Sequence, residues 1–341
     1  MSIAAAAGLK LPTPIPLLPV AGMSRSRGRS LRIYSVVGGC FRRGAPMTAQ
    51  TLDQRSCSCG PEDDDLPVAL LSASVHDPSL SPSLMALTVD YELKSWRASA
   101  LATHVVDWVL DFALRRSERA MLTPGRATEL ARRAVKITFG NGNDRGVPGE
   151  VLLHAVCRQF FGSDTVINKV WFKTASNDTY KGFDAVHCVH EGDELQLWLG
   201  EAKFYKSLTS AIRSVATDLN EHLDQDYLRS EFALIADKID DDHPHGDELR
   251  RLMHPNTSLD EVFDRIVVPV FVAYESTVTA AHDHVCAEYR EALEAEVRRA
   301  WIKFGNAIDS NLAVTVRLFL LPMASKKALT DALDEELTRW R

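Results

Sequence analysis

The sequence predicts an α/β fold with a mixed central sheet that is flanked by helices. Helical periodicity alternates with short apolar runs along the second half of the chain, as in folds whose strands are joined by helical crossovers. Three of these runs follow one another with short connections, so they should pair as an antiparallel meander. Of the 341 residues, 45% are hydrophobic and 25% are charged, a balance typical of globular proteins that bury a core.

Residues 1–65 differ in composition from the rest of the chain. They are rich in Ala, Pro, Gly, Ser and Arg and have no sustained apolar period. The Arg-rich, acid-poor start could be an organellar transit peptide, and it lacks the hydrophobic region of a secretory signal peptide. We favour a disordered or non-native N-terminal extension, which includes the case of translated sequence upstream of a later start at Met47 or Met85.

Residues 66–148 are predicted to form a mainly helical N-terminal region. The apolar run 66–71 could begin a strand. A helix is expected over about 96–119, where apolar residues recur at a spacing of three to four, and a second helix is expected over 124–139. The Gly- and Asn-rich segment 140–146 then predicts a loop.

Residues 149–341 are predicted to form the α/β domain. A helix begins at Pro148-Gly149 and should continue to Phe161. The turn residues Glu191-Gly192-Asp193 join the second and third strands of the meander. The remaining predicted elements are strands over 166–173, 182–190 and 195–203, a helix over about 205–238 with a break near 224–226, a strand over 266–274, a helix over 280–304, a strand over 312–321 and a helix over 326–340.

Charge and cysteine content restrict the class of protein. The whole chain carries a net charge of −7 and residues 1–60 carry +7, so residues 61–341 carry −14. An acidic body does not hold DNA by electrostatics alone, so a metal ion or a basic partner would have to help neutralise the phosphates. The six scattered Cys residues, and the lack of any apolar run near the roughly 20 residues of a membrane span, predict a reduced, cytoplasmic protein outside the membrane.

Two consecutive predicted strands carry charged residues where burial is expected. Asp184 lies near the start of one strand, and Glu201 and Lys203 end the next one, directly after the apolar run 195–199. Burying such charges costs several kcal/mol each unless they are paired or bind a metal. The alternative is an edge hairpin whose charges face solvent and pair with one another.

Carboxylates and a Lys in this arrangement indicate metal-dependent hydrolysis of phosphodiesters. Mg²⁺ and Mn²⁺ prefer oxygen ligands, and Asp184 and Glu201 could converge on one ion with the backbone carbonyl of Ala202 as a further ligand. Glu201 and Lys203 lie two residues apart and therefore point to the same face of a strand, where Lys203 would orient the attacking water or stabilise the developing charge. Glu150, in the first turn of its helix, could be the fourth member, although a first-turn Glu commonly only complements the helix dipole.

Other polar residues near this hairpin could contact the phosphates of a nucleic acid. Lys173, Asn177 and Lys181 lie in the loop before the first of the two strands, where they could contact phosphate oxygens or simply be solvated. Arg213, on the helix after the site, could approach a phosphate or belong to the surface.

A zinc site at His187, Cys188 and His190 is a further reading of the same strand. The alternation of side chains places His187 and Cys188 on opposite faces, which disfavours their convergence on one ion.

Several segments of the chain resemble one known family. They are Gly149-Glu150 and the segments 173–177, 181–187 and 199–205, and the Gly-Glu-Ala-Lys-Phe-Tyr sequence in the last of them is the most specific. From about Trp96 to the C-terminus the chain is similar to the HamA family, the nuclease subunit of Hachiman anti-phage defence systems. That family is a branch of the PD-(D/E)xK restriction-endonuclease-like superfamily, and here a Phe stands where a Pro usually precedes the first Asp.

The resemblance implies a restriction-endonuclease-like core and a metal-dependent deoxyribonuclease that works with a superfamily 2 helicase partner of the HamB type. By position it assigns the catalytic set, with Mg²⁺ or Mn²⁺ as cofactor and DNA as substrate. That set is Glu150, Asp184, Glu201 and Lys203. The alternatives are a catalytically inactive subunit that binds the helicase or senses DNA, and a nuclease that acts on RNA or modified DNA. The intact charged residues argue against an inactive subunit. A site that no longer catalyses a reaction tends to lose its charged residues, because they are costly to bury.

Overall fold

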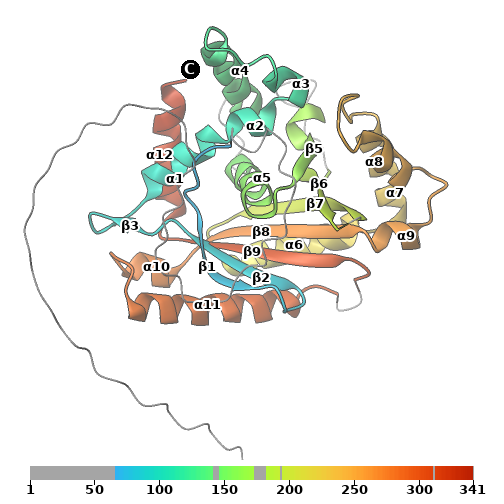
Figure 1. The fold of residues 1–341 in the computed structure, drawn as a ribbon. Coiled ribbons are helices and arrows are strands. Elements are labelled where there is room, and N and C mark those ends of the chain that lie inside the picture. Colours follow the sequence, from blue (N-terminus) through green and yellow to red (C-terminus); the bar gives the residue numbers. More distant parts are fainter. Residues whose placement is uncertain (1–65, 141–145, 173–181, 193, 310–311, 341) are drawn as a thin grey trace, which may run out of the picture. The chain divides into compact units, whose positions relative to one another are not determined.

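Seven strands form one mixed sheet in the computed structural model, which describes residues 66–140, 146–172, 182–192, 194–309 and 312–340 (Figure 1). In order across the sheet, the strands are β1 (Ser72–Asp77), β2 (Ser83–Thr88), β9 (Thr315–Met323), β8 (Ile266–Glu275), β7 (Glu194–Phe204), β6 (Ala185–Glu191) and β5 (Asp164–Asn168). The four from β2 to β7 run parallel. Antiparallel pairing adds β1 at one edge and β6 and β5 at the other.

Helices cover both faces of this sheet. The core on one face includes side chains from α1 (Ala98–Asp107), α2 (Val109–Ala113), α4 (Ala127–Phe139), α5 (Val147–Phe161) and α12 (Lys326–Thr338). The core on the other face includes α6 (Leu208–His222), α7 (Gln225–Ala236), α8 (Gly246–Leu252), α9 (Leu259–Phe263) and α11 (Ala287–Gly305). In Figure 1, α5 lies above the sheet and α11 below it, so the unit that contains the sheet has three layers.

Shorter elements complete the described part of the chain. They are the two-stranded sheet of β3 (Tyr91–Glu92) and β4 (Ser95–Trp96), the helices α3 (Arg116–Arg119) and α10 (Thr277–Ala281), and the 3₁₀ helix η2 (Lys169–Phe172).

Side-chain alternation along β7 assigns its residues to the two faces. Leu197 and Leu199 belong to the core on the α6 side, and Trp198 belongs to the core on the α5 side. Gly200 also faces α5, because a Cβ atom on it would lie 2.8 Å from Leu153 Cδ2. The next residue, Glu201, therefore points to the α6 side of the sheet.

The predicted α/β fold with a mixed sheet between helices is confirmed. The predicted helix break near 224–226 is also present, because α7 begins at Gln225 and the Asp224 side chain accepts hydrogen bonds from two backbone N–H groups of its first turn. The strand predicted over 166–173 instead begins at Asp164 and ends at Asn168. The chain then turns into η2, which directs Lys169 away from the strand and toward Asp184.

Several local predictions for residues 66–148 are wrong. The run 66–71 precedes β1 and forms no strand, and β1 and β2 were not predicted because they are short and lie in a Ser- and Pro-rich stretch. The helix expected over 96–119 is divided into α1, α2 and α3, and Leu114 between the last two has an extended backbone. This region therefore contributes two strands to the central sheet as well as helices.

The predicted N-terminal extension, residues 1–65, lies outside the described residues. Among the helices that the structure describes, none is long and apolar enough to cross a membrane.

We predict that Gly200→Ala lowers the free energy of unfolding by about 1–3 kcal/mol, the usual effect of overpacking a filled core. The added methyl group would lie 2.8 Å from Leu153 Cδ2 and 3.3 Å from the Ala185 carbonyl oxygen, and neither can move freely between α5 and the sheet. Urea denaturation followed by circular dichroism measures the change. Gly305→Ala, where the new Cβ meets nothing within 4 Å, is the matched control and should shift stability by less than about 1 kcal/mol. Equal midpoints for the two variants would contradict the assignment of Gly200 as a close contact.

Acid should destabilise the protein through His104, which is buried on α1. Burial lowers its pKa from 6.5 to about 4, and its Nε2 accepts a hydrogen bond from the Trp108 indole. The unfolded state therefore binds a proton between pH 6.5 and 4 that the folded state does not, so stability falls as the pH falls through this window. The contribution is about 3 kcal/mol at most.

His104→Gln keeps an acceptor for Trp108 but does not titrate. The unfolding free energy of this variant should therefore depend less steeply on pH between 6.5 and 4 than that of the wild type, with a slope smaller by up to one proton. Denaturant titrations across the window measure both slopes, and identical slopes would show that His104 does not titrate as described.

Candidate active site

The antiparallel pairing of β6 and β7 brings the predicted acids together. Ala185 at the start of β6 is opposite Gly200, and the Asp184 amide donates a hydrogen bond of 2.9 Å to the Gly200 carbonyl. Asp184 thus lies beside Glu201, and both side chains are buried, with relative exposures of 5% and 2%. The structure confirms that these charges are not on a solvent-facing edge hairpin.

Two donors hold the carboxylate of Asp184. Its Oδ1 accepts a hydrogen bond of 2.8 Å from Lys169 Nζ, and its Oδ2 accepts one of 2.9 Å from the Ala202 amide. The backbone bond fixes the orientation of the carboxylate relative to β7, and the Lys169 ammonium supplies a positive charge. The predicted metal-binding role of the Ala202 carbonyl stays a prediction.

Glu201 is held by partners from β7 and α6. Its Oε1 is hydrogen bonded to Nδ1 of His222, the last residue of α6, and its Oε2 lies 3.6 Å from Lys203 Nζ. The Lys203 ammonium also pairs at 2.5 Å with Oδ2 of Asp218. Since Asp218 and His222 are four residues apart on α6, they lie on the same face of that helix.

Aromatic rings fix the position of His222. The ring of Phe183 meets it edge-on at a centroid distance of 5.2 Å, and Tyr227 of α7 stacks on it at 4.8 Å. Burial lowers the pKa of His222, but the hydrogen bond and the negative charge of Glu201 outweigh burial, so its pKa is raised. Phe183, the residue before Asp184, therefore forms part of the wall of the site.

Glu150 approaches the same place from the α5 side. It lies in the first turn of α5 and is buried. A Cβ atom on the preceding Gly149 would lie 3.2 Å from Phe204 Cβ and 3.7 Å from Ala202 Cβ, so the start of the helix packs on the end of β7. The negative charge of Glu150 also helps to raise the pKa of Lys169, the residue whose ammonium holds Asp184.

The buried acids and bases of the site shift one another's protonation. Burial raises the pKa of Glu201, and the nearby charge of Asp184 raises it further. Burial lowers the pKa of Lys169, but the charges of Asp184 and Glu150 outweigh burial and raise it above its usual range. The pKa of Lys203 is likewise raised, because Glu201 and Asp184 outweigh its burial. The carboxylates of the site therefore favour the protonated, positively charged forms of the bases around them.

This donor set fits Mg²⁺ or Mn²⁺ in one of their usual binding modes. Mg²⁺ commonly binds through one or two carboxylates and keeps several waters, and Mn²⁺ accepts the same oxygen ligands. Asp184 and Glu201 supply two such carboxylates, and a bound cation would offset both the burial and the mutual repulsion that raise the pKa of Glu201. Within the described residues, no group of three or more His, Cys, Asp or Glu side chains forms a ready metal cage. The residues thus fit a partly hydrated ion better than a closed structural site.

Of the other predicted contact residues, only Arg213 is among the described residues. Lys173, Asn177 and Lys181 lie outside the described residues. Arg213 lies on α6 and lines a hollow toward Lys303 of α11. It precedes Asp218 by five residues, which places it about 140° away around the helix axis, so it points away from Lys203.

The zinc reading of the β6 histidines is not supported. His187 faces α5 and bonds to His154, whereas Cys188 belongs to the core on the opposite face.

Sequence reasoning missed Lys169, Asp218 and His222. The two α6 residues have a sequence signal, an acid and a His at i and i+4 on the first helix after the charged strand. Lys169 has only the weak signal of a single Lys within an apolar run.

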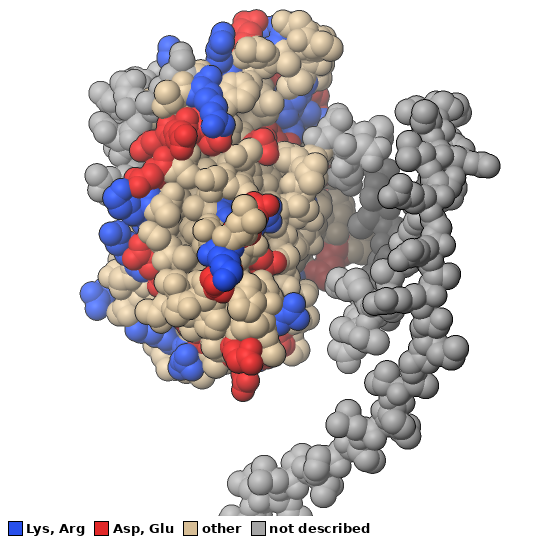
Figure 2. Space-filling view, turned by 90° about the vertical axis from the view of Figure 1, so that its left-hand side faces the viewer, with Lys and Arg blue, Asp and Glu red and all other residues tan. Residues whose placement is uncertain are grey.

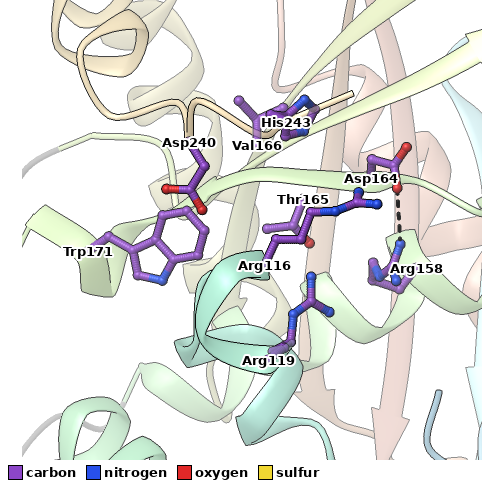
Figure 3. Close-up of a pocket in the computed structure, with 9 residues that line it drawn as sticks. All are labelled: Arg116, Arg119, Arg158, Asp164, Thr165, Val166, Trp171, Asp240 and His243. Atoms are coloured by element: carbon purple, nitrogen blue, oxygen red, sulfur yellow. Dashed lines mark ion pairs between the residues drawn. The ribbon is translucent and has the colours of Figure 1, made fainter. Parts of the chain in front are cut away.

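A separate polar pocket lies at the outer edge of β5 (Figure 3). Arg116 and Arg119 of α3 and Arg158 of α5 line it. The cavity measures about 20 Å³, which is room for about one water molecule. Arg158 pairs with Asp164 at 3.7 Å and Arg119 pairs with Asp111. These arginines are therefore largely engaged by acids of the chain itself.

A comparison with models of protein families finds a match. The family model described as HamA matches residues 65–337, a span that includes every strand of the central sheet and the candidate site. No curated protein matches the chain.

We predict that Lys169→Met lowers the free energy of unfolding by about 2–4 kcal/mol, because removal of one partner of a buried pair leaves an uncompensated charge on Asp184. Urea denaturation in the absence of divalent ions measures the change. Lys327→Met breaks the Lys327–Asp331 pair, whose side chains are 74% and 61% exposed, and should change stability by less than about 1 kcal/mol. Equal effects for the two variants would show that the Lys169 charge is not needed in the core of the site.

Proposed function

The chain belongs to the HamA family, and we propose on this basis that it is a metal-dependent DNA endonuclease. Family membership indicates a role in anti-phage defence. The proposed cofactor is Mg²⁺ or Mn²⁺, and the proposed partner is a superfamily 2 helicase of the HamB type. The observation that carries the proposal is the burial of Asp184 and Glu201 side by side, in contact with Lys169 and Lys203.

Asp184 and Glu201 would hold the ion, and Glu150 would assist from the start of α5. When bound, a divalent cation supplies the Lewis acid that neutralises the phosphate and activates a water. Lys203 would donate from Nζ to that water or to a phosphate oxygen, and Asp218 orients the ammonium for this task through the 2.5 Å pair. His222 keeps Glu201 in place by its hydrogen bond to Oε1.

The charge of the body supports a partner that contributes to DNA binding. Residues 61–341 carry −14, and the face shown in Figure 2 carries basic and acidic side chains interspersed, without a broad surface of either sign. Tight binding to DNA requires neutralisation of several phosphates by Lys and Arg. We therefore assign the tight binding of DNA, and the control of when the DNA is cut, to the helicase.

The competing class is an inactive subunit that binds the helicase or senses DNA. Such a subunit has no use for buried carboxylates, which could be replaced by apolar residues at no loss of stability. The burial of Glu201 at 2% exposure, with its pKa raised, therefore supports a catalytic use of the site.

We predict that Glu201→Gln and Lys203→Met each reduce Mg²⁺-dependent cleavage of plasmid DNA by at least about 10³-fold, since the lost charge stabilisation is worth several kcal/mol. The full chain is assayed alone and in complex with its helicase partner, with ATP, and with plasmid, linear DNA and RNA as substrates. Binding of the helicase should be unchanged, as measured by gel filtration of the complex.

Lys206→Met is the matched control, because Lys206 is an exposed residue three positions after Lys203, beyond the end of β7. This variant should cut like the wild type. Full cleavage by Glu201→Gln would disprove the site assignment, and binding of the helicase without any cleavage by the wild type would favour the inactive subunit. Cleavage of RNA alone would leave the site intact and correct the substrate.

A further inference from the structure

A chain of four buried polar side chains, termed here the Asp111 network, runs from α2 to β6. Oδ2 of Asp111 lies 2.7 Å from Nε2 of His154, Nδ1 of His154 lies 3.2 Å from Nε2 of His187, and Nδ1 of His187 lies 2.8 Å from Oγ of Ser163. All four residues are buried, and both histidines are almost fully so. The candidate site does not include any of them.

The direction of each hydrogen bond follows from the chemistry of the groups. An ionised carboxylate only accepts, so His154 must donate from Nε2 to Asp111 and must therefore accept at Nδ1. His187 then donates from Nε2 to His154 and accepts at Nδ1 from the Ser163 hydroxyl. Every ring nitrogen is satisfied with both imidazoles neutral. Burial lowers the pKa of each histidine, in agreement with this protonation.

Two arginines anchor the outer end of the network. Arg119 pairs with Oδ1 of Asp111, and Arg158 Nε donates to Oδ2 at 3.3 Å. Burial alone would raise the pKa of Asp111, but the hydrogen bond from His154 and these two positive charges lower it below its usual value. Figure 3 shows both arginines, with Arg158 paired to Asp164 at the edge of β5.

The network joins two of the three elements that carry the predicted metal-site acids, α5 with Glu150 and the β6 segment with Asp184. His154 follows Glu150 by four residues on α5, so the two side chains lie on the same side of the helix one turn apart. His187 follows Asp184 by three residues on the β6 segment. The bond between His154 and His187 therefore ties α5 to β6 one helical turn from Glu150 and three strand residues from Asp184.

Stability alone does not account for these polar groups. Apolar residues of similar size in their place would keep the core filled and would often be as stable or more so. Hydrogen bonds differ from apolar contacts in that they are directional and fix one register of a helix on a strand.

We propose that the Asp111 network is a positioning device, which holds α5 against β6 so that Glu150 and Asp184 keep the spacing that a divalent ion needs. Its residues touch neither the substrate nor the reacting atoms, and they act through the two acids. This inference rests on the proposed metal site and extends it to residues of a different layer.

The test measures the affinity of the full chain for Mn²⁺ in the absence of DNA, by electron paramagnetic resonance of the free ion. His187→Phe removes both hydrogen bonds and should weaken Mn²⁺ binding about 10-fold or more, the usual effect of losing a residue that orients a metal ligand. His187→Gln can still donate to His154 and should restore most of the affinity. The double variant His154→Leu/His187→Leu removes both rings, so neither histidine is left unpaired, and it should fold but bind Mn²⁺ as weakly as His187→Phe.

His104→Leu is the matched control, because His104 is a buried histidine that bonds to Trp108 outside the network. It should alter stability without altering Mn²⁺ affinity. The inference is overturned if the folded double variant binds Mn²⁺ like the wild type, or if His104→Leu weakens binding equally. If the wild type itself does not bind Mn²⁺, the proposed function is refuted, and this inference with it. That result differs from the two results above, in which the wild type binds Mn²⁺ and only the inference fails.

Discussion

Asp184 and Glu201 are buried next to each other, and this imposes a cost that the surrounding elements must compensate. Two carboxylates removed from water repel each other, and each loses hydration worth several kcal/mol. The fold compensates with Lys169 from η2, Lys203 from β7 and His222 from α6. These partners come from separate elements, so the two acids can be buried in their charged form only when all of those elements have come together.

The topology explains how those elements meet. β6 and β7 are antiparallel, so the residue that precedes β6 lies beside the carboxyl end of β7. β7 and β8 are parallel, so the chain must cross over between them, and α6 begins this crossover directly after β7. The helix therefore returns along the face that Glu201 and Lys203 occupy, and its Asp218 and His222 reach both residues.

The sequence predicts those parts of this arrangement that depend on patterns between residues close to one another in the chain. Alternation along 195–203 predicts that Glu201 and Lys203 share a face, and the order of elements predicts the mixed sheet. Lys169 could not be predicted, because its place depends on the turn from β5 into η2 and on a contact with Asp184, fifteen residues further along the chain. The i, i+4 spacing of Asp218 and His222 is also that of an ordinary solvated helix face, so the pattern alone does not choose between the two. β1 and β2 are too short for their periodicity to exceed the signal of the surrounding turn residues.

Glu150 differs from the other acids because it reaches the site from the opposite face of the sheet. Glu150 lies in the first turn of α5, where Gly149 packs on the end of β7, so the position of its carboxylate depends on the position of the whole helix. A slip of α5 by one residue moves it by about 1.5 Å, far more than the roughly 0.2 Å tolerance of a metal–ligand distance. The contact of Leu153 with Gly200 limits how closely α5 approaches the sheet. An apolar contact is not directional, so it does not prevent α5 from shifting along its own axis. A directional bond such as that of His154 to His187 does prevent it, so shape sets the height of the helix and hydrogen bonding sets its register.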